Sequence, residues 1–260
     1  MVGWMHYLGR GTLMDQRKGI QIIRDNETRN RFRLGEDVCL CARQANRSAT
    51  AASVRFFGLC RLGSRSDWLC RHLMAVCLYQ AFGTPRSMNT ARYIFGTLAR
   101  DGHSDSQVWF WSTKGFYSNI NLHLHHLQAS AAQGNQFAQL LLGEYQSSND
   151  RGAAFGWFTA SALQGNRRAQ YHLGRMYQGG LGVPRDINMA VEWYQLSATQ
   201  NCSLAQYELG ICFLKGLGVA RNRSTANELL HAAAKQGDTE AMAELRKIGG
   251  IRGHTPEPIF

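Results

Sequence analysis

Residues 169–200 and 205–236 have closely similar sequences, and this internal duplication constrains the fold more than any other feature of the chain. The first copy reads AQYHLGRMYQGGLGVPRDINMAVEWYQLSATQ, and the second reads AQYELGICFLKGLGVARNRSTANELLHAAAKQ. Corresponding positions lie 36 residues apart. Self-similarity at a fixed period of this size is the signature of stacked supersecondary units. The duplication therefore predicts a repeat architecture.

Each copy has the pattern of two helices joined by a turn. The residues 179–184 (GGLGVP) end the first helix, because glycine adopts positive φ after a helix and proline cannot continue one. Asp186 or Asn188 is the expected N-cap of the second helix. Neither helix can bury its apolar stripe alone, so successive pairs must stack. The stripe of the first helix consists of three side chains spaced four residues apart: Ala169, Leu173 and Tyr177.

Weaker copies of the unit extend toward the amino terminus, where Leu142-Gly143 repeats Leu173-Gly174 and Pro85-Arg86 repeats Pro184-Arg185. We predict an all-α fold, a right-handed α/α solenoid of about six to seven helix-turn-helix repeats whose first and last units are incomplete. One solenoid is expected over residues 1–260. Its expected parts are a partial repeat at 1–24, an irregular helical stretch at 25–70, repeats at 71–105, 106–137, 138–168, 169–204 and 205–240, and a terminal helix and tail at 241–260.

The repeated positions closely resemble the Sel1-like repeat family, a relative of the tetratricopeptide repeats. The family pattern has an alanine, a Leu-Gly pair, a tyrosine, a Gly-x-Gly-Val loop, an acidic residue, and an alanine followed by Trp-Tyr. Residues 169–198 carry every element, whereas the copy at 205–234 has Leu229-Leu230 in place of Trp-Tyr. The resemblance implies an interaction scaffold without catalytic activity. Family members act in bacterial secretion and host contact, in fungal cell-wall synthesis and in membrane-protein complexes, so we expect an adaptor, activator or assembly factor.

The charge is positive and uneven. The chain has a net charge of +11; residues 1–105 carry 16 basic and 8 acidic side chains, which leaves +3 for the remainder. Such a bias favours an acidic partner or an anionic membrane surface at the basic amino-terminal half. Binding of anionic membrane or nucleic acid stays open as an alternative function, although the arginines are scattered and no nucleic-acid-binding motif is present.

The seven cysteines do not recur with the repeat, which argues against a disulfide framework. Cys39-x-Cys41 lacks a second pair of ligands at zinc spacing. No apolar run approaches the roughly 18 to 20 residues of a membrane span, and the first residues lack the order of a signal peptide. We therefore expect a cytoplasmic location, provided that no targeting segment precedes the chain.

The histidines of NLHLHH are the strongest candidates for chemistry. On a helix, His123 and His126 would share a face and could hold a metal ion, so a metal-dependent hydrolase is a second alternative. Both fall on the packing side of their helix, however, so we favour a buried, hydrogen-bonded pair. The motifs of β-lactam-acylating enzymes and of phosphate-binding loops are absent. We predict no catalytic residue, no metal and no cofactor.

The variable positions of the first helices should form the binding surface. They point away from the apolar stripe and would line the concave side of a solenoid, where a partner segment can lie across several repeats. Part of this strip must also contact neighbouring repeats, so packing between repeats is the competing interpretation. The predicted strip consists of Leu140, Glu144, Tyr171, Arg175, Gln178, Tyr207 and Ile211.

Overall fold

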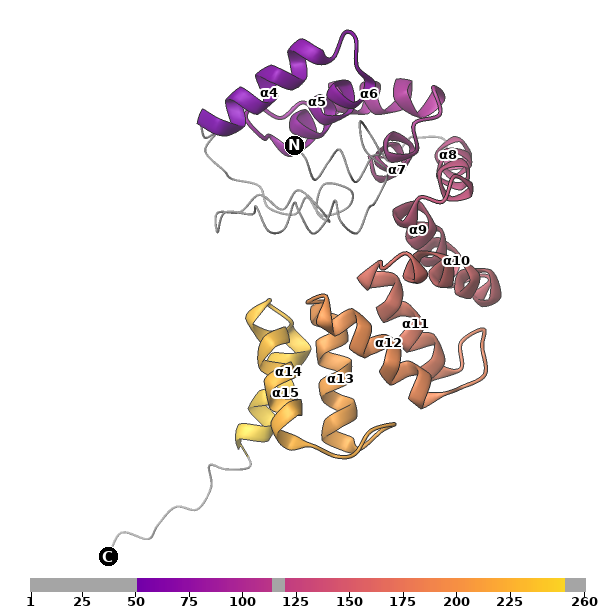
Figure 1. The fold of residues 1–260 in the computed structure, drawn as a ribbon, viewed down its shortest axis with the longest axis vertical. Coiled ribbons are helices and arrows are strands. Elements are labelled where there is room, and N and C mark those ends of the chain that lie inside the picture. The colour runs from indigo at the N-terminus through magenta and orange to yellow at the C-terminus, as the bar shows by residue number, and fades with distance from the viewer. Residues whose placement is uncertain (1–50, 114–119, 251–260) are drawn as a thin grey trace, which may run out of the picture. The chain divides into compact units, whose positions relative to one another are not determined.

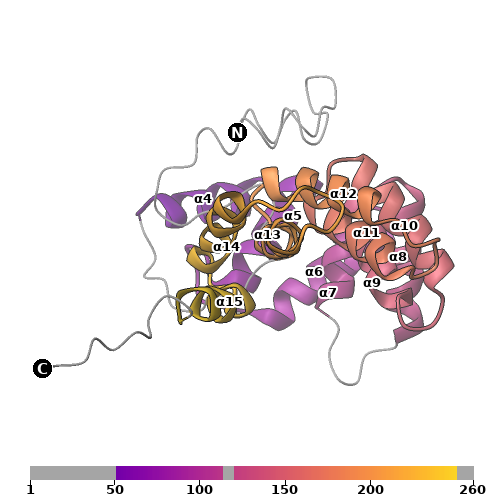
Figure 2. The same cartoon turned by 90° about the horizontal axis from the view of Figure 1, so that it is seen from below.

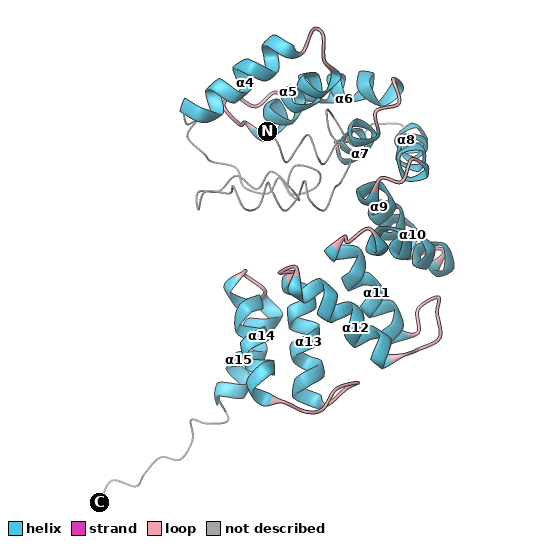
Figure 3. Cartoon of the chain, in the orientation of Figure 1, coloured by secondary structure: helices cyan, strands magenta, loops and turns pink. Residues whose placement is uncertain are grey.

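The described part of the chain is entirely helical. The structure is a computed structural model that describes residues 51–113 and 120–250, and these residues form twelve α-helices and no strand (Figures 1 and 3). The predicted partial repeat at 1–24, the residues 25–50, Cys39-x-Cys41 and the tail beyond residue 250 lie outside the described residues. The helices are α4 (Ala51–Gly63), α5 (Trp68–Gln80), α6 (Met88–Arg100), α7 (Ser104–Ser112), α8 (Ile120–Ala132), α9 (Gln136–Gln146), α10 (Arg151–Leu163), α11 (Arg167–Gly179), α12 (Ile187–Thr199), α13 (Ser203–Lys215), α14 (Arg223–Lys235) and α15 (Thr239–Gly250).

From α4 to α8, and again from α10 to α15, each helix packs on the next one along the chain. We call α5, α7, α9, α11, α13 and α15 the A helices, and α4, α6, α8, α10, α12 and α14 the B helices. A helices pack on the B helices that follow them, as α11 does on α12 and α13 on α14, and B helices pack on the next A helix, as α6 does on α7 and α12 on α13. In both Figure 1 and Figure 2, α13, α14 and α15 lie side by side. This packing confirms the all-α helical-repeat solenoid.

The chain divides into two compact units, residues 1–138 and residues 139–260, and the division falls inside α9. In the carboxy-terminal unit, a core cluster joins α11, α12 and α13 through Tyr171, Tyr194 and Leu209. In the amino-terminal unit, the corresponding cluster contains Phe95 of α6 stacked on Trp109 of α7, with ring centroids 5.2 Å apart.

A glycine on the A helix allows the B helix of the same pair to approach closely. A Cβ atom on Gly174 would lie well inside van der Waals contact with the ring of Tyr194, which is fully buried. The preceding residue, Leu173, is also buried. The Leu-Gly pair of the repeat is therefore a packing requirement. The equivalent contacts in the neighbouring repeats are Gly143 with Phe158 and Gly210 with Leu230.

The loop glycines serve the contact between repeats as well as the turn. Gly182 has a φ of 74°, and a Cβ atom there would lie 2.5 Å from the carbonyl oxygen of Arg151, at the start of the preceding B helix. Gly218 has a φ of 67°, and its Cβ would lie 2.9 Å from the carbonyl oxygen of Ile187. The Gly-x-Gly loop thus passes directly over the backbone of the neighbouring repeat, where no larger residue fits.

Side-chain caps begin the helices where the sequence predicts them. Asp186 is the N-cap of α12, and its Oδ1 accepts hydrogen bonds from the backbone N–H groups of Asn188 and Met189. This confirms Asp186 over Asn188 as the cap. Such a cap satisfies backbone donors that the helix itself cannot pair. The same role falls to Asp67 in α5, Asp150 in α10, Asn166 in α11 and Asn222 in α14.

Buried glutamines of α7, α11 and α13 link their repeats to the preceding B helix, in an arrangement that we call the glutamine relay. Gln170 of α11 donates from Nε2 to the carbonyl oxygen of Ala162, 3.3 Å away at the end of α10. Its Oε1 accepts from Nε2 of Gln200, at the end of α12, at 2.7 Å. One side chain therefore joins three helices. The other amide pairs of the relay are Gln107 with Gln133, Gln139 with Gln164 and Gln206 with Gln236.

Adding a methyl group at the A-helix glycine should weaken the fold. We expect Gly174→Ala to lower the free energy of unfolding by about 1–3 kcal/mol, because Tyr194 must move out of a packed position. Urea unfolding followed by circular dichroism measures the change. The control is Gly156→Ala on the exposed face of α10, where no atom lies within 4 Å of the new Cβ. That substitution should raise stability by about 0.5–1 kcal/mol, because alanine has the higher helix propensity. Equal effects at both positions would contradict the packing argument.

Breaking the glutamine relay should also destabilise the chain. We expect Gln170→Leu to cost about 1–3 kcal/mol, since the carbonyl of Ala162 and the amide of Gln200 would lose their partner in a buried position. The matched control is Gln195→Leu, at an exposed position of α12, which should change stability by less than about 0.5 kcal/mol. If the two variants unfold at the same urea concentration, the relay does not hold the repeats together.

Candidate functional site

The structure divides the predicted strip into buried and accessible residues. Leu140 of α9 is fully buried, and Tyr171 of α11 and Ile211 of α13 are each 8% exposed. The expectation that these three line an open surface is therefore wrong: neighbouring helices cover them. The remaining strip residues are accessible: Arg175 is exposed, and Glu144, Gln178 and Tyr207 are half-buried.

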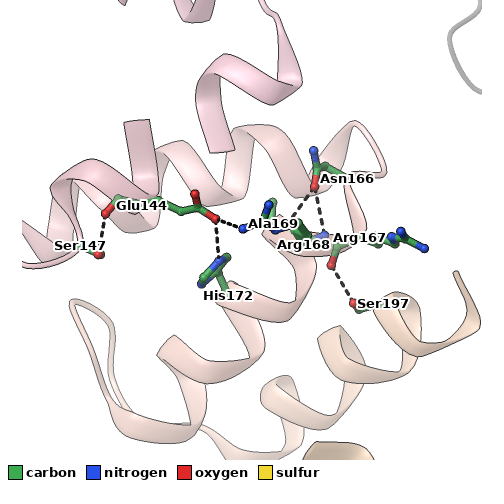
Figure 4. A network of polar contacts seen from close by, with 8 residues as sticks. All are labelled: Glu144, Ser147, Asn166, Arg167, Arg168, Ala169, His172 and Ser197. Atoms are coloured by element: carbon green, nitrogen blue, oxygen red, sulfur yellow. Dashed lines mark hydrogen bonds and ion pairs between the residues drawn. The ribbon is translucent and has the colours of Figure 1, made fainter. Parts of the chain in front are cut away.

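Glu144 belongs to a contact between repeats. Its Oε1 accepts from Nη2 of Arg168 at 2.7 Å and lies 3.3 Å from Nε2 of His172, so the carboxylate of α9 is held by two side chains of α11 (Figure 4). Burial alone would raise the pKa of Glu144, but the hydrogen bond from His172 and the charge of Arg168 outweigh it and lower this pKa. Glu144 is therefore satisfied by its own chain.

The same region holds the backbone of α11 in place, as Figure 4 also shows. Asn166 caps α11 by accepting hydrogen bonds from the N–H groups of Arg168 and Ala169. Ser197 of α12 donates to the carbonyl oxygen of Arg167 at 2.7 Å. These bonds position Arg168 and His172 to reach Glu144, so this end of α11 serves packing between repeats.

Further along α11, the strip residues gather around a carboxylate that the sequence analysis missed, Glu208 of α13. The guanidinium of Arg175 lies 6.0 Å from the ring centroid of Tyr171, and Gln178 accepts a hydrogen bond from the hydroxyl of Tyr194. Burial raises the pKa of Glu208 above its ordinary value, although the charge of Arg175 and a hydrogen bond with Gln178 act in the opposite direction. We call the accessible group Arg175, Gln178, Tyr207 and Glu208 the α11–α13 surface.

Glu208 could have been found from the repeat alignment. It occupies the position of His172 in the preceding copy, one residue after the Tyr171/Tyr207 position. In α11 this position pairs with Glu144 of the preceding A helix, whereas in α13 it approaches Arg175. Each of these residues therefore faces the preceding A helix. Because this position is a histidine in α11 and a glutamate in α13, the two repeats carry different charges on this surface.

Tyr207 lies at the edge of a second apolar cluster. It is partly buried and packs against the cluster formed by Ile211, Leu230, Ala233 and, on α15, Ala241. Burial raises the pKa of its hydroxyl, and the carboxylates of Glu240 and other acidic residues add to the rise. One side of the ring is therefore fixed by packing, and the polar end remains beside acidic groups on α13 and α15.

The histidine pair is buried, as the sequence analysis favoured. His123 and His126 of α8 are 3% and 7% exposed. Nδ1 of His123 donates to the carbonyl oxygen of Phe110 at 2.9 Å, and its ring stacks on the ring of Phe110 with centroids 4.1 Å apart. His126 meets the same ring edge-on. Within residues 51–113 and 120–250, no three His, Cys, Asp or Glu side chains are grouped so that they could hold a metal ion. The same segments contain no helix that is both long enough and apolar enough to cross a membrane.

The two glutamates of this region should respond to substitution in opposite directions. At pH 7, Glu144→Gln should lower stability by about 1 kcal/mol, since it breaks a partly exposed ion pair. Glu208→Gln should raise the thermal midpoint, because it removes a charge whose burial is unfavourable. The contribution of Glu144 is complete above its ordinary pKa of 4.5 and is lost as the pH falls below it. The cost of Glu208 also disappears on acidification, because its raised pKa lets the folded state bind a proton first.

Thermal unfolding of both variants between pH 3 and pH 8 would measure these effects. Both differences from the unchanged chain should shrink toward zero at the acidic end. A destabilised Glu208→Gln variant at pH 7 would show that this carboxylate is structural.

Comparisons with known proteins agree with this architecture. A Sel1 repeat protein from Oxalobacter formigenes is 21% identical and has a TM-score of 0.69, with 76% of this chain and 86% of that chain covered. A protective antigen from uropathogenic Escherichia coli with an SLR fold is 20% identical, with a TM-score of 0.60 and coverage of 95% and 55%. An immunity protein from Pseudomonas aeruginosa is 14% identical, with a TM-score of 0.52 and coverage of 76% and 86%. No curated protein matches the sequence. At these identities the solved structures establish a shared fold.

The sequence itself carries the family signature. The profile of the Sel1 repeat matches four segments that together make up more than half of the chain: residues 69–103, 137–166, 167–202 and 203–238. Each begins within two residues of a predicted repeat. The protein therefore belongs to the Sel1 repeat family.

Proposed function

We propose that this protein is a non-catalytic scaffold that binds a segment of a partner protein across α11 and α13. Sel1 repeat proteins are generally protein-interaction scaffolds, so the general role follows from the family. The specific proposal concerns the α11–α13 surface, and the observation that carries it is the half-buried position of Glu208 beside Arg175, Gln178 and Tyr207. This carboxylate is half-buried, its pKa is raised by burial, and the nearby Arg175 does not compensate fully.

An incompletely compensated carboxylate costs stability, and such groups persist where function needs them. A cationic side chain from a partner would supply the missing charge, in a position already shielded from water on one side. Glu144 shows the contrast within the same chain, because Arg168 and His172 already satisfy it. Glu208 is therefore the candidate for contact with a partner, whereas Glu144 contributes to packing between repeats.

The neighbours of Glu208 suit an amphipathic segment. Tyr207 offers a partly buried aromatic ring, and Arg175 offers an exposed guanidinium that can pair with a carboxylate. Tyrosine and arginine are the side chains that most often anchor protein interfaces. Both charge signs lie within one small surface, which favours a mixed-charge peptide or helix over a polyanion. The process that the scaffold serves, whether secretion, host contact, cell-wall synthesis or a membrane-protein complex, would be set by the partner.

Crosslinking in the native cells, followed by mass spectrometry, would identify the partner and locate its contacts. Against that partner, Glu208→Gln should weaken binding about tenfold, the loss of one charge-assisted hydrogen bond, while the thermal midpoint rises. Arg175→Gln should weaken the complex and lower the thermal midpoint slightly, because Arg175 offsets part of the burial cost of Glu208.

The matched control is Glu144→Gln, which should lower the thermal midpoint and leave affinity unchanged. If Glu208→Gln leaves the affinity of the crosslinked partner unchanged, or if every crosslink falls outside α11, α13 and α15, the partner binds elsewhere.

A further inference from the structure

A pocket of about 350 Å³ lies on α6 and α8 of the amino-terminal unit. It is formed on α6 by Arg92, Tyr93 and Arg100, on α8 by Leu122 and His126, and on α7 by Phe110. The residues of each helix follow the three- and four-residue spacing of a single helical face. The pocket is therefore formed mainly by the B helices α6 and α8, whereas the α11–α13 surface is formed by A helices of the other unit.

The pocket is open because one position on α6 lacks a side chain. The fully buried alanines Ala91 and Ala190 occupy equivalent positions and fix the register between the B helices. In that register Gly96 corresponds to Gln195 of α12, and to Thr159 and His231 in the neighbouring B helices. A Cβ atom on Gly96 would lie 3.0 Å from Cε2 of Phe110. Any longer side chain would extend over the Phe110 ring and fill the pocket.

The charged groups around the pocket are all basic. No carboxylate lines it. Arg92 uses its Nε to donate to the carbonyl oxygen of Thr113 at 2.9 Å, and Arg100 uses its Nε on the carbonyl of Gly96 at 3.3 Å. These bonds orient the two guanidinium groups and leave their terminal nitrogens for a ligand. Neither arginine forms an ion pair with a carboxylate in the described part of the chain.

The pKa of His126, which lines the pocket, also reflects the positive charge there. The pKa of His126 is lowered, first by burial and then by the neighbouring His125, His123 and Arg100. No acidic neighbour is among these causes. An anionic group entering the pocket would therefore meet positive charge without competition.

The rim of the pocket is apolar and unusually exposed. Tyr93 is 68% exposed and Leu122 is 47% exposed. In the B helices α12 and α14, the position of Tyr93 is held by glutamates, Glu192 and Glu228. Where α12 and α14 have a charged residue, α6 therefore has an aromatic ring next to two arginines. Such a combination suits a ligand that has both an apolar side chain and negative charge.

We propose that this pocket binds an acidic peptide segment of a partner protein. One apolar side chain of the segment enters between Tyr93, Leu122 and Phe110, and carboxylates on either side of it pair with Arg92 and Arg100. The two arginines are eight residues apart on α6, which places them about 12 Å apart along the helix axis. An extended peptide rises about 3.3 Å per residue, so the two acidic residues should be about four positions apart with the apolar residue between them.

Synthetic peptides test this geometry directly. The probes are fluorescein-labelled peptides of the sequence Glu-Ser-Phe-Ser-Glu, with Leu and Trp versions of the central residue, and binding to the full chain is measured by fluorescence anisotropy. The amide counterpart Gln-Ser-Phe-Ser-Gln and the counterpart with a central serine are the ligand controls. We expect the best acidic peptide to bind at least about tenfold more tightly than either control, and we expect added salt to weaken it.

Variants of the chain then locate the site. Gly96→Gln installs the side chain that α12 carries at this position and should abolish peptide binding. Arg100→Gln removes an exposed charge and should weaken binding about five- to tenfold. The control is Arg223→Gln, an equal charge change at an exposed position of α14, which should leave binding unchanged. Circular dichroism and the thermal midpoint show whether each variant is folded. If Gly96→Gln does not fold, Arg100→Gln still tests the site.

Three outcomes would overturn the proposal. The acidic peptides bind no better than their amide counterparts, or Arg100→Gln binds them as tightly as the unchanged chain. The third outcome is a dimer of the protein that Gly96→Gln dissociates, because the pocket would then be occupied by a second copy of this chain. None of these outcomes bears on the α11–α13 surface, because that surface is tested with other variants.

Discussion

The close approach of two helices at a glycine is the constraint on which the rest of the carboxy-terminal unit depends. Because Gly174 carries no side chain, the ring of Tyr194 lies against the backbone of α11, and the two helices form a single compact element. Because the helices lie this close, the amide of Gln170 reaches both Gln200 at the end of α12 and Ala162 at the end of α10. A longer distance between the helices would break the glutamine relay, and the repeats would lose their buried polar connection.

The relay and the loop glycines explain why the last two full repeats stack in the same way. Buried amides must find partners, since an unpaired one costs about 1–3 kcal/mol. Gln170, Gln206 and their partners satisfy this requirement only if each repeat has the same rotation relative to the last. Gly182 and Gly218 add a steric limit, because each passes over the backbone of the preceding B helix. Stacking is therefore specified by directional and steric contacts as well as by apolar burial.

The sequence predicts this framework well because its signals are local and repeated. The stripe of Ala169 and Leu173, the glycine-containing loop and the cap at Asp186 can each be recognised within one copy, and the second copy checks them. The binding strip could not be predicted with the same success. A helical wheel shows that Leu140, Tyr171 and Ile211 point away from their own pair, but it contains no information on what the neighbouring repeat covers. In a solenoid, the burial of a side chain depends on its own helix pair and also on the neighbouring repeat. The sequence of a single repeat predicts only the packing within its own pair.

Both surfaces that we propose for binding lie where the chain departs from what stacking requires. Glu208 stands where the preceding repeat has a histidine paired with Glu144. Gly96 stands where other B helices have larger side chains, and Tyr93 stands where α12 and α14 have glutamates. A framework position tolerates little change, because it contacts the same atoms in every repeat. A departure that leaves a buried charge incompletely compensated, or a pocket beside two arginines, lowers stability or exposes apolar surface without any gain for the fold. In a repeat protein the internal copies thus act as their own reference, and the residues that differ from it at a physical cost are the ones through which this scaffold can recognise a partner.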